Sequence, residues 1–203
     1  MDVFFSPLAC SMASRIVIYE AGGTAHFVRV DTKTQRTADG QDYTKINPKG
    51  LVPAIRTTDG EVLTENAAVL QYLGELYPDA ALLSAGFGRH LVRQWLSFIG
   101  TELHSGVFHP LFSSKAGTEA KAFVLAEALR PFTYLNDHLD GHEWLLDGFT
   151  VADAYLTVVL NWARFVSLDL AAYPNVAAYL DRSRRKPPIE KAINEELALF
   201  QTA

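Results

Sequence analysis

The chain has 203 residues, of which 49% are hydrophobic and 20% are charged, and its formal net charge at pH 7 is −5. This composition is ordinary for a soluble globular protein of one large or two small domains. Its acidic balance argues against nucleic-acid or anionic-membrane partners. No apolar run approaches the roughly 20 residues that span a bilayer, so we expect no membrane segment.

The first part of the chain, residues 1–80, alternates strand and helix patterns. A strand, a helix and a second strand predict a parallel β-α-β unit, and Asp59-Gly60 between two short apolar runs is typical of a hairpin. This order predicts a thioredoxin-like α/β domain with helices on a mixed sheet. The predicted elements are a strand at 3–5, a helix at 11–20, strands at 26–31, 52–56 and 61–63, and a helix from 64 to 77.

The rest of the chain contains no alternating strand pattern. After a linker at 84–88, long helical patterns predict an all-helical domain over residues 87–203. Pro131 should bend or break the second of these helices, because a proline inside a helix loses a hydrogen bond and clashes with the preceding turn. Thr150 and Asp153 resemble a capping box, which we interpret as a structural device. The predicted helices cover 89–111, 118–139, 150–166, 175–186 and 189–200.

The single cysteine, Cys10, excludes an internal disulfide framework and a cysteine-rich zinc site, and we expect no metal. The beginning of the chain lacks the basic and apolar regions of a signal peptide, so we expect a cytoplasmic, reducing setting that leaves the thiol free. Cys10 follows a strand and the Ser6-Pro7 break, at the predicted start of a helix. Unpaired N–H groups and the positive end of the helix dipole favour a thiolate there. The alternative, a small buried apolar residue, stays open.

A polar stripe on the helix at 89–111 gives a second candidate. Ser97, Gly100, Thr101 and His104 recur at i, i+3, i+4 and i+7, so they share a face of an otherwise apolar helix. Such a stripe favours the wall of a wet cleft. His104 could donate to a thiolate or act as a general base, although a solvated face with a surface histidine fits the pattern equally well.

The third candidate is Thr64-Glu65-Asn66, where the last helix of the first domain begins. Free N–H groups at a helix start suit a carboxylate, and Glu65 could pair with an ammonium group, although acidic residues at this position often only stabilise the helix. The backbone at Val52, just before Pro53, could pair with an extended peptide. A thiol site, an amine-and-carboxylate site and a peptide edge together match the chemical groups of glutathione.

Six short motifs in the chain match one known family in their order and spacing. They are Ser6-Pro7-x-Ala9-Cys10-Ser11, Asn47-Pro48-x-Gly50-x-Val52-Pro53-Ala54, Leu63-Thr64-Glu65, Trp95-Leu96, Thr101-Glu102-Leu103-His104 and Thr150-Val151-Ala152-Asp153-Ala154-Tyr155. On these motifs the chain resembles the bacterial beta-class glutathione transferases essentially from end to end. The resemblance implies a thioredoxin-like domain followed by an all-helical domain, a glutathione site in the cleft between them, a homodimer and a cis peptide before Pro53.

The resemblance also implies roles for individual residues. Cys10 would contact the glutathione sulfur and could hold it as a mixed disulfide, and the Val52 backbone would pair with the cysteinyl part. Glu65 and Asn66 would hold the γ-glutamyl end, and His104 would support catalysis near the thiol. The complete predicted glutathione-binding set is Cys10, Gln35, Val52, Pro53, Glu65, Asn66, Ser97, Thr101 and His104.

Four positions depart from the family pattern. Gln35 stands where many members have a lysine that reaches the glycine carboxylate of glutathione, and Ser105 stands where many have a second lysine. Ser97 replaces an asparagine and Phe5 a tyrosine. Because each charge-assisted contact contributes about 1.5–3 kcal/mol, we expect weaker glutathione binding than in a typical member, or compensation by nearby cations at 33 and 36.

The favoured function is a glutathione transferase that conjugates the glutathione thiolate to small hydrophobic electrophiles, with Cys10 and His104 lowering the pKa of the thiol by hydrogen bonding and by their field. We assign the electrophile pocket to Leu8, Phe108, Phe112 and Trp162. One alternative is glutathione-dependent thiol-disulfide exchange or peroxide reduction through Cys10. Another is a protein that binds glutathione or hydrophobic ligands without turnover. The identity of the electrophile is not predicted.

Overall fold

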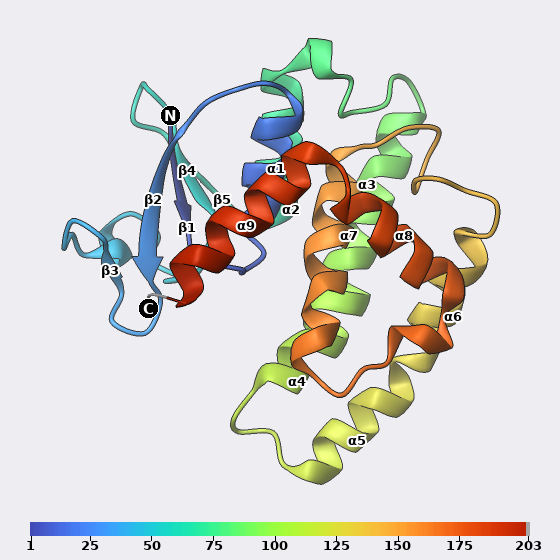
Figure 1. Cartoon of the computed structure of the whole chain (residues 1–203). Coiled ribbons are helices and arrows are strands. Elements are labelled where there is room, and N and C mark those ends of the chain that lie inside the picture. The colour runs from blue at the N-terminus through green and yellow to red at the C-terminus, as the bar shows by residue number, and fades with distance from the viewer. Residues whose placement is uncertain (202–203) are drawn as a thin grey trace. The chain divides into compact units, whose positions relative to one another are not determined.

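The structure is a computed structural model that describes residues 1–201 (Figure 1). Contacts within the chain define two compact units. We call them unit 1, which comprises Met1–Leu83 and the segment from Lys186 onward, and unit 2, which comprises Ser84–Arg185. No helix among the described residues combines the length and the apolar character needed to cross a membrane.

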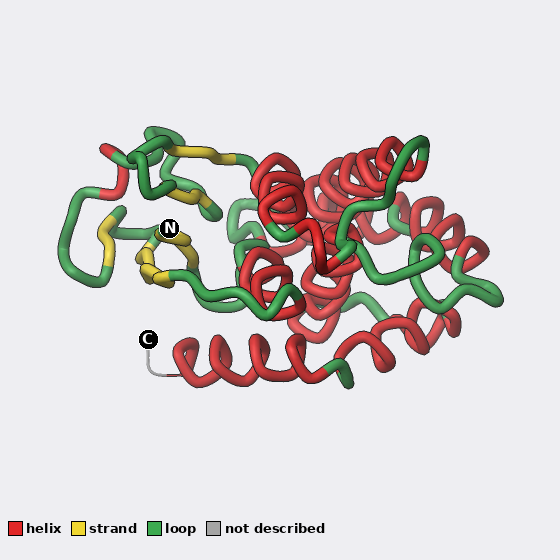
Figure 2. Tube along the Cα trace, turned by 90° about the horizontal axis from the view of Figure 1, so that it is seen from above, coloured by secondary structure: helices red, strands yellow, loops and turns green. Residues whose placement is uncertain are grey.

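Unit 1 is built on a five-stranded mixed sheet with the order β3-β2-β1-β4-β5. The central strand β1 runs parallel to β2 and antiparallel to β4, and places Val3 opposite Phe27 on one side and Ile55 on the other. In Figure 2 the strands are yellow, and the last helix is the long red helix that ends near the C label. The elements are β1 (Asp2–Phe5), α1 (Met12–Glu20), β2 (His26–Asp31), β3 (Arg36–Thr37), β4 (Ala54–Arg56), β5 (Val62–Thr64), α2 (Asn66–Leu76) and α9 (Pro187–Gln201), with 3₁₀ turns at Tyr43–Lys45 and Pro78–Ala80.

The sheet and its helices form because apolar side chains recur at strand and helix spacing. Phe4, Val30, Tyr43 and Ala54 meet in a buried cluster within the sheet region. The predicted hairpin is present between β4 and β5, and Gly60 supplies a φ of 88° that side-chain-bearing residues rarely adopt. The mixed sheet confirms the predicted class of this part of the chain.

The assignment of α9 corrects the predicted ranges 1–80 and 87–203. The sequence pattern predicted the helix, but α9 belongs to unit 1, where it packs along α1. The apolar face of α9, including Ile189, Ala192 and Ile193, is buried. Helix periodicity shows which face is apolar but not which neighbour covers it, so this correction needed the three-dimensional structure.

Unit 2 contains helices and no strand over 84–185, which confirms the predicted all-helical part. Its elements are α3 (Gly88–Phe98), a π-helix η3 (Ile99–Phe108), α4 (His109–Phe112), α5 (Thr118–Glu127), α6 (Leu129–His138), α7 (Val151–Asn161) and α8 (Pro174–Arg184), with 3₁₀ turns at Trp162–Phe165 and Leu170–Ala172. Helix α7 is buried along its whole length and forms the core of this unit.

Local signals explain two features of unit 2. The helix predicted at 118–139 is interrupted at Ala128, and Pro131 lies in the first turn of α6, where a missing N–H costs no hydrogen bond. At the start of α7, Thr150 Oγ1 accepts from the Ala152 N–H, and Asp153 Oδ2 accepts from the Thr150 N–H at 2.8 Å. The predicted capping box is therefore present.

Candidate functional site

The loop between β1 and α1, which we call the Cys10 loop (residues 6–11), is closed by its own hydrogen bonds. The Ser6 N–H donates to Ser11 Oγ at 3.2 Å, and the same hydroxyl donates to the Ser6 carbonyl at 3.3 Å. Leu8 adopts a positive φ of 61° within the loop, a conformation that costs a side-chain-bearing residue free energy. Helix α1 begins at Met12, two residues after the cysteine.

The Cys10 thiol donates to the carbonyl of Val52, with 3.3 Å between Sγ and the oxygen. Val52 precedes the cis peptide bond to Pro53. Burial is the largest of the effects that together raise the pKa of the Cys10 thiol to about 12; the N–H groups of Cys10 and Ser11 lower it, and the charges of Glu65 and Glu196 add smaller upward contributions.

The N–H groups near the start of the helix do lower the pKa of Cys10, as the sequence predicts, but the effect of burial on this pKa is larger. This balance opposes a thiolate at the partly buried Cys10 in the ligand-free protein, and the role of Cys10 in the site stays a prediction. The sulfur carries its proton at neutral pH and acts as a hydrogen-bond donor.

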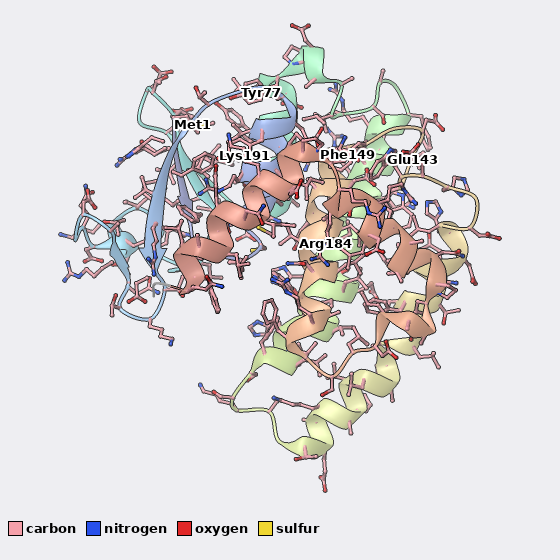
Figure 3. The ribbon with its side chains drawn as sticks, viewed as in Figure 1. Met1, Tyr77, Glu143, Phe149, Arg184 and Lys191 are labelled. Carbon is pink, nitrogen blue, oxygen red and sulfur yellow. The ribbon has the colours of Figure 1, made fainter. Side chains whose placement is uncertain are left out.

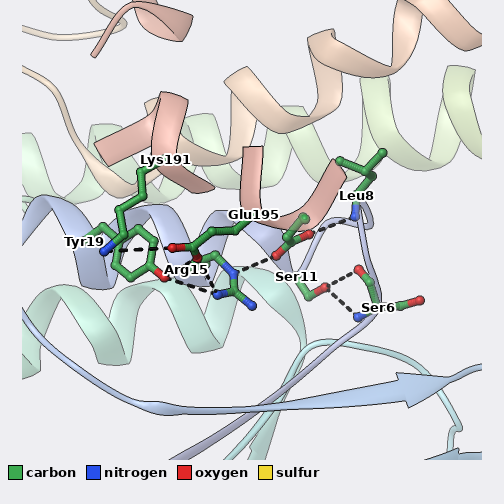
Figure 4. Close-up of polar contacts among 8 residues, drawn as sticks. Ser6, Leu8, Ser11, Arg15, Tyr19, Lys191 and Glu195 are labelled. Carbon is green, nitrogen blue, oxygen red and sulfur yellow. Dashed lines mark hydrogen bonds and ion pairs between the residues drawn. The ribbon is translucent and has the colours of Figure 1, made fainter. Parts of the chain in front are cut away.

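A buried carboxylate on α9 holds the Cys10 loop against α1. Glu196 is 0% exposed; its Oε2 accepts from the Leu8 N–H at 2.8 Å and its Oε1 from Arg15 Nε at 3.0 Å. Arg15 Nη1 also contacts Glu195 Oε2 at 3.1 Å, and Tyr19 donates to the same oxygen at 2.6 Å (Figure 4). This network ties the last helix of the chain to the loop that carries the cysteine.

Lys191, labelled in Figure 3, extends the contact between α9 and α1 at the surface of unit 1. Its Nζ lies 4.1 Å from the centroid of the Tyr19 ring, a cation–π contact. Burial raises the pKa of Glu196 to about 7, although Arg15 and the Leu8 N–H favour its ionised form. Sequence reasoning did not single out Glu196; the available signal was a carboxylate on the otherwise apolar face of the last helix.

The start of α2 carries an unusual polar site. Glu65 has a positive φ of 70° and an exposed side chain, and Lys49 Nζ forms an ion pair with its carboxylate and donates to Thr64 Oγ1 at 2.8 Å. Asn66 is the first residue of α2, and within the described part of the chain neither atom of its buried carboxamide has a hydrogen-bond partner. An unpaired buried polar group is costly, and the carboxamide of Asn161 in unit 2 shares this condition; Asn66 differs from it in lying at the first residue of a helix, beside Glu65.

Gln35 is held by backbone groups rather than free to reach a ligand. Its Nε2 donates to the Thr32 carbonyl at 2.6 Å and to the Gly50 carbonyl at 3.2 Å. Gly50 has a φ of 67°, which favours glycine, and a Cβ there would lie 2.4 Å from Gln35 Oε1, so that any side chain at this position would displace the end of Gln35. Arg36 Nη1 donates to the Gly40 carbonyl at 3.1 Å.

In unit 2, the π-helix η3 brings His104 to α7. His104 Nδ1 lies 2.6 Å from the Tyr155 hydroxyl, and the centroid of its ring lies 4.8 Å from that of Trp162. Burial, together with the charge of His109, lowers the pKa of His104 to about 4. The imidazole is therefore neutral at pH 7, the form that can accept a proton as a general base or donate one hydrogen bond, so both predicted roles of His104 stay open. When Tyr155 donates to Nδ1, Nε2 carries the proton and is the donor.

The predicted polar stripe is only partly formed. Ser97 and Thr101 are exposed, and the Thr101 hydroxyl donates to the Ser97 carbonyl at 3.0 Å, so it is satisfied within its own helix. The spacing argument assumed α-helical winding throughout, whereas the helix is π-wound from Ile99 to Phe108. The turns of a π-helix contain more residues, so residues beyond Ile99 are rotated relative to the prediction.

Three of the residues assigned to the electrophile pocket meet in unit 2. Trp162 contacts Phe108 and Phe112 edge-on, with ring centroids 5.7 and 5.8 Å apart. Phe108 is fully buried and also packs on Phe132, so it belongs to the core, whereas Phe112 remains 47% exposed. Leu8 lies in unit 1, in the Cys10 loop, and is buried.

Comparisons with known proteins identify the family. The family description "Glutathione S-transferase, N-terminal domain" matches residues 9–76, and "Glutathione S-transferase, C-terminal domain" matches residues 118–182. The chain is 40% identical to glutathione S-transferase GstA of Escherichia coli O157:H7 over 97% of this chain and 98% of that protein.

Solved structures agree with this assignment. A ternary complex of the bacterial glutathione S-transferase BphK matches with a TM-score of 0.93 and 36% identity, covering 97% of this chain and 99% of that one. The bacterial beta-class enzyme of Sphingomonas chungbukensis matches with a TM-score of 0.91 and 38% identity, covering 97% and 98%.

The chain therefore belongs to the glutathione S-transferase family, and its resemblance to the bacterial beta class is confirmed. The predicted fold class and transferase activity are confirmed with it.

Proposed function

We propose that unit 1 binds glutathione through the Cys10 loop, the Val52 backbone and the start of α2, and that the transferase conjugates the glutathione thiolate to small hydrophobic electrophiles. The observation that carries this proposal is the buried carboxamide of Asn66, unpartnered among the described residues, at the first residue of α2. A solved relative, a sphingomonad glutathione S-transferase complexed with glutathione, matches this chain with a TM-score of 0.92 and 36% identity over 97% of this chain and 98% of that one.

The γ-glutamyl end of glutathione fits the start of α2 by charge. Its ammonium group would pair with the exposed Glu65 carboxylate, and its carboxylate would accept from the Asn66 amide and from the N–H groups of the first turn. Lys49 already contacts Glu65 in the ligand-free protein. The incoming ammonium group therefore competes with Lys49 for the same carboxylate.

Cys10 and His104 would act as neutral donors rather than as charges. A thiol whose pKa is raised to about 12 keeps its proton at pH 7 and can turn from the Val52 carbonyl to a glutathione thiolate. Hydrogen bonds to the charged form of a group lower its pKa. We propose the same kind of support from His104 Nε2, since His104 is neutral at this pH. Phe108, Phe112 and Trp162 would contribute apolar surface to the electrophile site.

The other end of glutathione lacks a cationic anchor at position 35. Gln35 is uncharged and is bonded to two backbone carbonyls. We therefore propose weaker glutathione binding than in relatives with a lysine at this position, unless Lys33 or Arg36 supplies the contact. Pro53, Ser97 and Thr101 remain proposed members of the binding set.

The raised pKa of Cys10 favours conjugation over the alternative in which Cys10 attacks a disulfide or peroxide, because the thiolate is the nucleophile in such attacks. A binding protein without turnover is distinguished by measuring the rate with an aryl halide and glutathione. A catalysed rate above the uncatalysed rate excludes that alternative.

We also propose a homodimer and a cytoplasmic location. Large apolar side chains remain exposed on both units, which fits burial in an oligomer. They include Leu51, Val62 and Leu76 in unit 1 and Phe87, Phe123 and Leu129 in unit 2. Light scattering after size exclusion would measure the mass, and a monomer at micromolar concentration would contradict the dimer.

Calorimetric titration of glutathione into Asn66→Ala tests the proposed site. Losing a hydrogen bond to a charged group costs about 1.5–3 kcal/mol, so the dissociation constant should rise between about tenfold and a hundredfold. Asn161→Ala in unit 2 is a matched control, because this buried carboxamide also has no partner among residues 1–201. An unchanged dissociation constant in Asn66→Ala would place glutathione elsewhere.

A further inference from the structure

The helix that carries His104 has π winding over ten residues, Ile99–Phe108. The His109 N–H at its end donates to the His104 carbonyl, five residues earlier, whereas an α-helix pairs residues four apart. π-Helical segments are rare, are usually a single turn long, and are frequent at functional sites. Because the π-helix η3 is longer than a single turn, we expect a residue in its sequence to favour π winding.

Burial along η3 follows the π winding. Ile99 is buried, and so are the residues four, eight and nine positions later, Leu103, Val107 and Phe108. α-Helical winding from Ile99 would also bury the positions four and eight residues later, but it would add the positions three and seven residues later and would not turn the position nine residues later toward the core. The position seven residues later, Gly106, is exposed. The apolar pattern of this helix therefore fits the π form.

Gly106 meets a constraint from the backbone of its own helix. A Cβ at this position would lie 2.9 Å from the Thr101 carbonyl oxygen, closer than real Cβ contacts, and a backbone atom cannot move aside as a side chain can. Since Gly106 is exposed, no packing neighbour requires the absence of a side chain. Glycine is among the least favourable residues inside a helix, so its place here indicates a conformational requirement.

The winding decides which way His104 faces. His104 Nδ1 is 2.6 Å from the Tyr155 hydroxyl, and a Cβ on Gly100, four residues earlier, would lie 3.9 Å from the same hydroxyl. Five residues separate His104 from the start of η3, and each π turn contains more residues than an α turn. Rewinding this stretch as an α-helix would rotate His104 away from α7.

We propose that Gly106 is a positioning residue for His104: its missing side chain permits the π winding of Ile99–Phe108, and that winding holds the imidazole against the Tyr155 hydroxyl. This inference rests on the role of His104 in the proposed function. Gly106 touches no reacting group; it acts through the orientation of the helix.

The test is Gly106→Ala, with Gly100→Ala as a matched control in the same helix. Both changes add one methyl group to a helical glycine, but the methyl group on Gly100 makes only ordinary contact. Histidine NMR titration reports the orientation of His104 separately from turnover. In the wild type and in Gly100→Ala, His104 should stay neutral from pH 5 to 8, as its pKa of about 4 requires.

In Gly106→Ala, His104 should lose its buried contact with Tyr155 and titrate near the ordinary histidine value of about 6.5. The kcat should fall by about tenfold or more, as when a donor to a developing charge is lost, while the KM for glutathione changes less than threefold. An unchanged His104 titration in a folded Gly106→Ala variant would overturn the positioning role, whatever its activity. If the His104 pKa shifts in Gly106→Ala but the kcat does not change, the positioning role of Gly106 is supported and the proposed role of His104 in catalysis is contradicted.

A measurement on the wild type decides the matter if Gly106→Ala does not fold. Scalar couplings across hydrogen bonds identify the carbonyl that accepts from each backbone N–H. We expect a coupling from the His109 nitrogen to the His104 carbonyl carbon. A coupling to the Ser105 carbonyl carbon instead would show α winding and overturn the proposal.

Discussion

The substitution Glu196→Gln tests the network that holds the Cys10 loop. Glu196 is completely buried, and its two oxygens accept from Arg15 Nε and from the Leu8 N–H. Glutamine keeps the shape of the side chain but cannot ionise. The variant therefore removes the charge of Glu196 while leaving one oxygen that can accept a hydrogen bond.

The raised pKa of Glu196 determines whether the free energy of unfolding rises or falls with pH. Burial raises this pKa from 4.5 to about 7, so the folded protein binds the proton more tightly than the unfolded chain. The resulting stabilisation is fully present below pH 4.5 and is lost as the pH rises through 7. At 1.36 kcal/mol for each pH unit, the whole effect is roughly 3 kcal/mol, of which about 2–3 kcal/mol falls between pH 5 and pH 8.

Urea unfolding at several pH values between 5 and 8 measures this contribution. Relative to Glu196→Gln, the wild type should lose about 2–3 kcal/mol of unfolding free energy over that range. Glu195→Gln is the control, because Glu195 contacts Arg15 and Tyr19 but is 39% exposed and does not bond the Cys10 loop. The charge of Glu195 makes only a small contribution to the raised pKa of Glu196, so the pH profile of Glu195→Gln should lie much closer to that of the wild type than the profile of Glu196→Gln does. Parallel profiles for the wild type and Glu196→Gln would refute the reasoning.

Two further predictions concern the glutathione site. Lys49→Met removes the exposed ion pair with Glu65, and because such pairs contribute about 0–1 kcal/mol, glutathione should bind up to about fivefold more tightly by calorimetry; weaker binding would mean that Lys49 contacts glutathione directly. Cys10→Ala should keep the kcat/KM for an aryl halide within about tenfold of the wild type, because one neutral hydrogen bond contributes about 0.5–1.5 kcal/mol. A loss greater than a hundredfold would instead assign Cys10 an essential chemical step.

Local patterns predicted the parts of the fold that depend on neighbouring residues. Asp59-Gly60 predicted the hairpin because glycine adopts the positive φ of that turn at little cost in free energy. Thr150 and Asp153 predicted the start of α7 because their side chains satisfy backbone N–H groups within one turn. The motifs around Cys10 and Glu65 are short and contiguous, so the resemblance to the family is carried by the sequence alone.

Other features depend on residues that are distant in the sequence. The pKa of Cys10 is raised by burial, which no helix-start argument includes. Glu196 is 188 residues from Leu8 in the sequence, yet its carboxylate accepts a hydrogen bond from the Leu8 N–H. The orientation of His104 depends on π winding, for which Gly106 is a weak local signal, because a glycine inside a helical pattern has several explanations. These contacts form only when the chain is folded.

The thiolate absorbance of the protein near 240 nm, followed from pH 6 to 10 with and without glutathione, tests the central claim that Cys10 is a neutral donor. We expect no thiolate signal from the free protein across this range, and one thiolate below pH 8 once glutathione is bound, in the wild type and more weakly in Cys10→Ala. A thiolate near pH 7 in the free protein that disappears in Cys10→Ala would contradict the claim.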